Sequence, residues 1–126
     1  MRRAGYQQAL QAAGLALDAA LLGYADVSAK SGYVVMKDML KRKRDVTAVF
    51  AGNDTIAFGV MRALDAAGRV VPRDVAVVGF DDIPLAGFAC PSLATTQTDP
   101  IACGHEAVNL LHGQMTGVPF PRLDTP

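Results

Sequence analysis

Apolar side chains recur every three or four residues in several parts of the chain, which is the spacing of an amphipathic helix. The first such segment is followed by Gly14 and a later one by Gly68, and glycine commonly ends a helix. Four basic residues at 41–44 fall in the last turn of another, where the helix dipole favours positive charge. The pattern predicts helices over 3–13, 31–44, 56–67 and 101–115.

Continuous apolar runs lie between the predicted helices and predict strands that are buried on both faces. Residues 46–51 and 75–80 are the clearest of these runs, and acidic or amide turn residues follow each of them. Shorter runs at 19–24 and 95–98 suggest two more strands. Because helices and buried strands alternate, we expect an α/β protein with a mainly parallel, right-handed sheet flanked by helices on both faces.

The charge balance argues against nucleic-acid binding by this chain. Its 126 residues fit one compact domain, and 12 Lys and Arg cancel 12 Asp and Glu. A domain that binds nucleic acid through phosphates carries a basic surplus instead. We therefore expect no direct contact with DNA or RNA.

The compartment is predicted from hydropathy and from the cysteines. The chain has no apolar stretch near the roughly 20 residues of a membrane helix, and its basic start turns polar where a secretory signal would be apolar. Cys90 and Cys103 lack metal-ligand spacing and suit unpaired thiols in a reducing compartment. We expect a cytoplasmic protein that does not enter a membrane.

Short polar side chains follow three of the predicted strands. In open parallel sheets, ligands bind beyond the carboxyl ends of the strands. The pairs at 26–27, 53–54 and 81–82 would therefore meet at one rim, where carboxylates and amides suit the hydroxyls of a sugar, polyol or nucleoside. We expect Asp54 and Asp82 to cap the helices that follow them, which leaves Asn53 and Asp81 as the ligand candidates.

The sequence carries no recognisable catalytic motif. It has neither a dinucleotide-binding nor a P-loop glycine motif, and its serines lack a nucleophile-elbow context. Asp81 and Asp82 alone are the basis for one alternative, an Mg²⁺-dependent hydrolase or phosphoacceptor domain. We expect no enzyme activity, no cofactor and no metal site.

The order of several segments points to a known family. The chain opens with RRAGY at 2–6, continues with DVTAVFAGND at 45–54 and VVGFDD at 77–82, and then has LATT at 93–96. Over nearly its whole length it resembles the LacI/GalR transcriptional regulators, whose members have an N-terminal helix-turn-helix and a two-lobed, periplasmic-binding-protein-like effector domain. The resemblance implies that 1–99 form the C-terminal lobe. It also implies that 100–126 form a crossover helix and tail that would pack on an N-terminal lobe outside this chain.

The resemblance also implies a function. Such a lobe supplies half of a cleft for a small-molecule effector, here a sugar or related polyhydroxy compound, and operator DNA is bound only through the N-terminal domain. Effector contacts are expected from Arg2, Asn53, Asp81, Val27, which stands where the family has a stacking aromatic, and Asp99. A homodimer is expected, with candidate contacts from Tyr33, Met36 and Met39. The alternative of the same fold is a fragment of a periplasmic sugar-binding protein.

Overall fold

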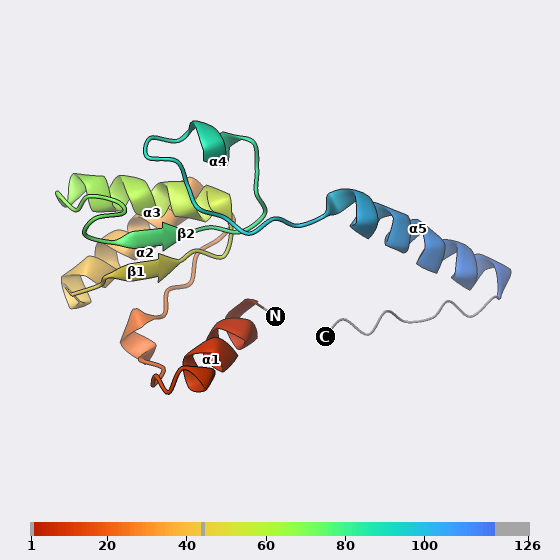
Figure 1. The fold of residues 1–126 in the computed structure, drawn as a ribbon, viewed down its shortest axis with the longest axis horizontal. Helices are drawn as coiled ribbons and strands as arrows, with labels where there is room; N and C mark the ends of the chain where they lie inside the picture. Colours follow the sequence, from red (N-terminus) through yellow and green to blue (C-terminus); the bar gives the residue numbers. More distant parts are fainter. Residues whose placement is uncertain (1, 44, 118–126) are drawn as a thin grey trace.

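The computed structural model describes residues 2–43 and 45–117 and alternates helices with two strands (Figure 1). Each predicted helix is present within a few residues of its expected bounds, and both Gly14 and Gly68 have a positive φ where their helices stop. In chain order the elements are α1 (Arg2–Ala12), the 3-10 helix η1 (Ala19–Leu21), α2 (Ala29–Arg42), β1 (Ala48–Phe50), α3 (Asp54–Ala66), β2 (Ala76–Val78), α4 (Leu85–Phe88) and α5 (Pro100–Thr116).

The two strands pair in parallel, which confirms the α/β class. Val49 lies opposite Val77, and α3 makes the crossover between the strands. The strand predicted at 95–98 is reduced to two isolated parallel bridges, Val78 with Ala94 and Asp81 with Gln97. The carboxyl ends of β1, β2 and this third segment therefore meet at one edge.

The prediction of a strand at 19–24 is wrong. The Asp18 carboxylate accepts a hydrogen bond from the backbone N–H of Ala20 at 2.8 Å and caps the 3-10 helix η1 there. Asp18 also pairs with Lys43 at 3.0 Å. The bond from Ala20, and after it the contact with Lys43, lower the pKa of Asp18. An apolar run alone does not reveal such a local cap, because short strands and buried turns are equally apolar.

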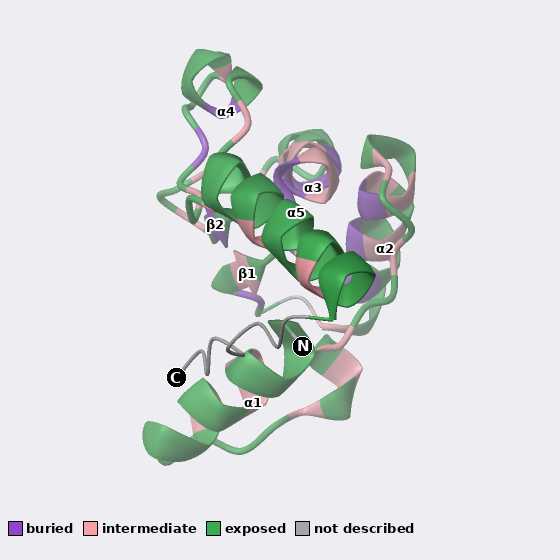
Figure 2. Ribbon diagram, turned by 90° about the vertical axis from the view of Figure 1, so that its right-hand side faces the viewer, coloured by how far each residue is buried: buried purple, intermediate pink, exposed green. Residues whose placement is uncertain are grey.

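Helices α2 and α3 lie side by side on one side of the strands (Figure 2). Two glycines allow the close approach of their backbones. A methyl group on Gly59 would overlap the carbonyl oxygen of Ala29 and lie 2.7 Å from the backbone nitrogen of Tyr33. A methyl group on Gly32 would collide in the same way with the carbonyl oxygen of Ile56. The contact between these helices is therefore one of backbone against backbone.

The hydrophobic core lies between these two helices and the strands. Leu64 and Val75 are fully buried in it, and Met36 and Met39 are only 1% and 7% exposed. The structure thus places Met36 and Met39 inside the chain and not on a surface that a second subunit could contact. Tyr33 is half-buried and packs against the same core. The helical spacing identified the apolar face of α2, but this chain itself covers that face.

The opposite face of the strands differs from the expectation of burial on both sides. Phe50 and Val78, which flank the inward-facing Val49 and Val77, are exposed. Within the described residues, α1 reaches this region through Tyr6, whose ring stacks on Phe50 at 6.4 Å between centroids. The face stays open because α3, which contacts β2, and its neighbour α2 lie on the other side.

Helix α5 projects away from the rest of the molecule, and none of its described residues is buried (Figure 1). Its large apolar side chains, from Ile101 to Met115, are exposed. The assignment of 1–99 and 100–126 to different lobes stays a prediction, and 118–126 lie outside the described residues. Among the described helices, none has the length and apolar character needed to cross a bilayer.

Candidate functional site

The loops after β1 and β2 form a polar rim at the carboxyl edge of the strands. The backbone N–H of Asp54, after β1, donates to the carbonyl oxygen of Phe80, after β2, at 2.9 Å. The backbone N–H of Asp81 donates in turn to the carbonyl oxygen of Thr96 at 3.0 Å. Three segments that are distant in sequence are thus joined at the edge where parallel sheets bind ligands.

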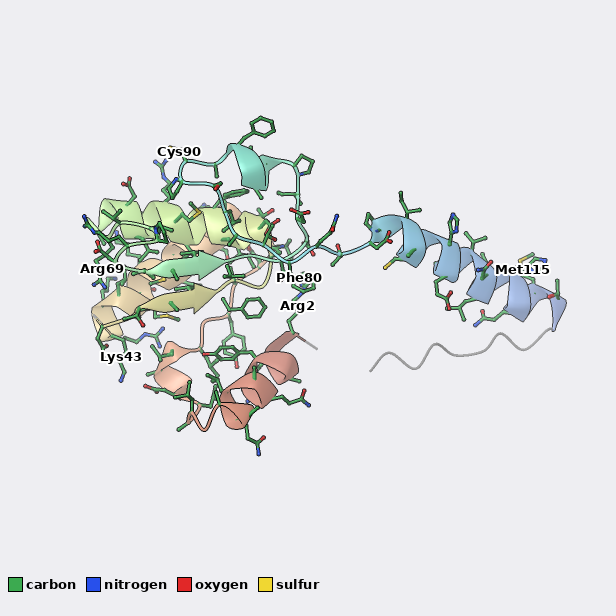
Figure 3. All side chains as sticks on the ribbon, in the orientation of Figure 1. Arg2, Lys43, Arg69, Phe80, Cys90 and Met115 are labelled. Atoms are coloured by element: carbon green, nitrogen blue, oxygen red, sulfur yellow. The ribbon has the colours of Figure 1, made fainter. Side chains whose placement is uncertain are left out.

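Arg2, at the start of α1, completes this rim from below the strands (Figure 3). Its guanidinium lies 3.3 Å from the Asp81 carboxylate and 4.3 Å from the centroid of the Phe80 ring. The Arg2 and Asp81 side chains remain 49% and 36% exposed. The structure therefore brings together two of the predicted site residues as an accessible ion pair that rests on an aromatic ring.

The capping roles at this rim differ from the prediction by one residue. Asn53, not Asp54, is the N-cap of α3, because its backbone is extended and its side-chain oxygen accepts from the N–H of Ile56 at 2.8 Å. Asp54 is fully buried as the first residue of the helix. Asp82 caps no helix either, since α4 begins at Leu85 after Pro84. The side-chain oxygen of Asn53, a predicted ligand contact, is thus engaged in the cap.

Asp54 instead joins the rim segments from within. One carboxylate oxygen accepts from the backbone N–H of Ile83 at 2.9 Å, and the other accepts from the Thr95 hydroxyl at 2.6 Å. The same hydroxyl accepts from the backbone N–H of Asp82 at 3.2 Å. Sequence reasoning missed both Thr95 and Phe80, because each acts through a partner that is remote in the chain.

The other predicted contacts are not brought to the Arg2–Asp81 pair by any described interaction. Val27 is 76% exposed and follows Asp26, whose pKa is lowered mainly by a hydrogen bond from the Ser28 hydroxyl. Asp99 caps α5, and its carboxylate accepts from the backbone N–H of Ile101 at 3.1 Å and of Ala102 at 2.9 Å. Neither observation tests whether a ligand would reach these residues.

The described part of the chain contains no group of three or more His, Cys, Asp or Glu side chains arranged to hold a metal ion. The rim instead offers a fork of guanidinium donors, carboxylate acceptors and an aromatic edge. Such a set suits a ligand with several hydroxyl groups.

The profile of the periplasmic binding protein-like domain family matches residues 1–124. The chain belongs to this family. Its fold agrees with that assignment, since the structure is an α/β lobe with a parallel pair of strands. Comparison with individual proteins shows which members of the family this chain resembles.

Among curated members, the chain is 41% identical to the HTH-type transcriptional regulator CelR of Thermobifida fusca. The 116 aligned residues cover 92% of this chain and 34% of CelR. The chain is 36% identical over 116 residues to the ribose operon repressor of Escherichia coli K12, with 92% and 35% covered. A solved structure of a CelR–cellobiose complex superposes with a TM-score of 0.88 at 40% identity, covering 92% of this chain and 36% of that one. The resemblance to the LacI/GalR regulators is confirmed, and the chain spans about a third of the length of these curated relatives.

Proposed function

We propose that this chain is the C-terminal lobe of the effector-binding domain of a LacI-type transcriptional regulator, and that its rim supplies half of a sugar site. The Arg2–Asp81 pair beside Phe80 is the observation that carries the proposal. The relatives support it, because one is a ribose operon repressor and another is seen in complex with cellobiose.

The chemistry of the pair suits vicinal hydroxyls. A guanidinium has five N–H donors and a carboxylate has about four acceptor positions, and the Arg2–Asp81 contact uses one of each. Both side chains are partly exposed, at 49% and 36%, so their remaining donors and acceptors are accessible to two neighbouring hydroxyls of a sugar. Asn53 and Asp99 would contribute only the polar atoms that their capping bonds leave available.

In the intact regulator, the effector would lie between this lobe and a second one. A ligand that contacts both lobes stabilises the arrangement in which they are close, and this shift in population changes the spacing of the DNA-binding segments. Operator DNA would be bound only by a helix-turn-helix outside this chain, since the net charge here is zero. We propose a cytoplasmic location, no catalytic role and no cofactor.

We also propose that the regulator is a homodimer, as DNA-binding regulators of this kind commonly are. With Met36 and Met39 in the core, the contacts would come from exposed apolar side chains such as Val34 on α2 and Phe88 on α4.

Calorimetric titration of the full-length protein encoded by the gene tests the sugar site, with cellobiose, lactose and ribose as the probes. We expect at least one of them to bind, and Asp81→Ala to weaken that binding by about 1–3 kcal/mol, the cost of losing a paired polar contact. Asp38→Ala is the matched control, because it removes an exposed carboxylate that pairs with Lys41 on α2, away from the rim. Absence of binding by all three sugars, or equal affinity for the Asp81 and Asp38 variants, would contradict the proposal.

A further inference from the structure

We propose that the buried Asp54 carboxylate and the Thr95 hydroxyl form a positioning pair that holds Asp81 in the orientation needed to bind the effector. This inference rests on the proposed function, since it assigns a role to residues that stand behind the same rim. Asp54 is fully buried, and the Thr95 hydroxyl bonds to the Asp54 carboxylate and to the Asp82 amide. Their action on the effector would be indirect, through the backbone of the turn.

The turn that carries Asp81 has a strained backbone. Asp81 has a φ of 109° and Asp82 a φ of 54°, in the region that residues with a side chain rarely adopt. Such a conformation persists only where the surrounding structure fixes it. The turn must therefore be held by bonds that a relaxed conformation would lose.

The positioning pair supplies two of those bonds. The amides of Asp82 and Ile83 immediately follow Asp81, and they donate to the Thr95 hydroxyl at 3.2 Å and to the Asp54 carboxylate at 2.9 Å. The Thr95 hydroxyl in turn donates to the other carboxylate oxygen at 2.6 Å. Both amides are thus attached, directly or through one hydroxyl, to the same carboxylate.

The carboxylate itself is held in place. Asp54 is 0% exposed and begins α3, where the helix N-terminus favours a negative charge. Gly79 lies against it, and a methyl group at Gly79 would collide with the carboxylate oxygen that receives the Thr95 hydroxyl. Helix α3 therefore holds the Asp54 carboxylate in place, and this carboxylate holds the turn that carries Asp81.

Removing the hydroxyl should release the turn without removing any effector contact. Thr95→Val keeps the shape of the side chain but leaves the Asp82 amide without its acceptor and one Asp54 oxygen without its donor. Thr95→Ser keeps the hydroxyl and is the conservative control. Val60→Ala, a core change on α3 far from the turn in sequence, controls for loss of stability alone.

Two measurements on the full-length protein test the pair. The first is calorimetry with cellobiose, lactose and ribose, in which Thr95→Val should weaken binding about tenfold or more, while Thr95→Ser and Val60→Ala stay within about twofold of the parent. The second is amide hydrogen exchange without sugar. The Asp82 and Ile83 amides should exchange at least about tenfold faster in Thr95→Val, and the Ala51 amide, which bonds to Val78 in the strands, should not change. If Thr95→Val does not fold, Thr95→Ala, which also lacks the hydroxyl, takes its place with the same expected results.

The outcomes separate this inference from the proposed function. If the parent binds none of the sugars, the proposed function fails, and exchange at Asp82 and Ile83 still decides whether the pair holds the turn. If the Asp82 and Ile83 amides exchange at the parent rate in Thr95→Val, the inference is overturned, with or without sugar binding. Faster exchange of these amides with unchanged sugar affinity also overturns it. The same holds if Val60→Ala loses as much sugar affinity as Thr95→Val.

Discussion

The crossing of α2 and α3 at Gly59 gives the sharpest stability prediction, because opposing effects of known size meet there. In an open helix, Gly→Ala gains roughly 1 kcal/mol from helix propensity. At Gly59 the added methyl group meets the Ala29 carbonyl and the Tyr33 amide nitrogen, which are backbone atoms that no side-chain rotation can move aside. The two helices must separate for Ala to fit.

The cost of separating the helices decides whether Gly59→Ala lowers or raises the free energy of unfolding. Overpacking a tight core costs about 1–3 kcal/mol and occasionally more, and a rigid backbone neighbour places this site at the upper end. Subtracting roughly 1 kcal/mol of propensity from about 3 kcal/mol leaves a net loss of about 2 kcal/mol or more. Domains are stable by only about 5–15 kcal/mol, so the loss is readily measured.

Urea unfolding followed by circular dichroism measures this effect. Gly104→Ala is the matched control, since Gly104 lies in α5 with no atom within 4 Å of the position of a methyl group. We expect the free energy of unfolding to fall for Gly59→Ala and not for Gly104→Ala. A Gly59→Ala protein as stable as the parent, or more stable, would refute the close backbone contact between the helices.

Two further predictions concern the buried core and the loss of stability at low pH. Met36→Glu buries an unpaired charge and should unfold the chain, because Met36 is only 1% exposed. Lys37→Glu, at an exposed position of the same helix, should leave the urea midpoint nearly unchanged. A folded, monomeric Met36→Glu protein would contradict the placement of Met36 in the core. Hydrogen bonds from the Arg73 side chain and from the backbone N–H of Val70 lower the pKa of Asp74 from 3.8 to about 2. The stabilisation from the ionised carboxylate is therefore complete above about pH 4 and is lost as the pH falls towards 2. Asp74→Asn should make the loss of stability over that range shallower, and equal pH slopes in the two proteins would show that the charge of Asp74 does not contribute.

The sequence predicted those elements whose signal is local and repeated. The periodicity of α3 and the apolar run of β2 each extend over enough residues to exclude other structures. The segment 19–24 lacked that length, and the Asp18 cap gave it a 3-10 helix instead. The Asn53–Asp54 pair shows the limit of local rules, because two residues able to cap stand side by side and only the backbone conformation selects one.

The site was predictable only where one residue carried the chemistry by itself. Asp81 follows the apolar run that predicts β2, so its place at the carboxyl edge could be deduced. The bond between Thr95 and Asp54 spans 41 residues, and no spacing rule connects them. The apolar face of α2 was equally ambiguous, because its pattern shows that something covers Met36 but not whether the cover is the same chain or another.

A crystal structure of the full-length protein with its bound sugar tests the central claim most directly. We predict that sugar hydroxyls contact both the Arg2 guanidinium and the Asp81 carboxylate at the carboxyl edge of β1 and β2, with the second lobe on the far side of the ligand. A sugar bound elsewhere, with neither Arg2 nor Asp81 within hydrogen-bond distance, would contradict the assignment of this rim as the effector site.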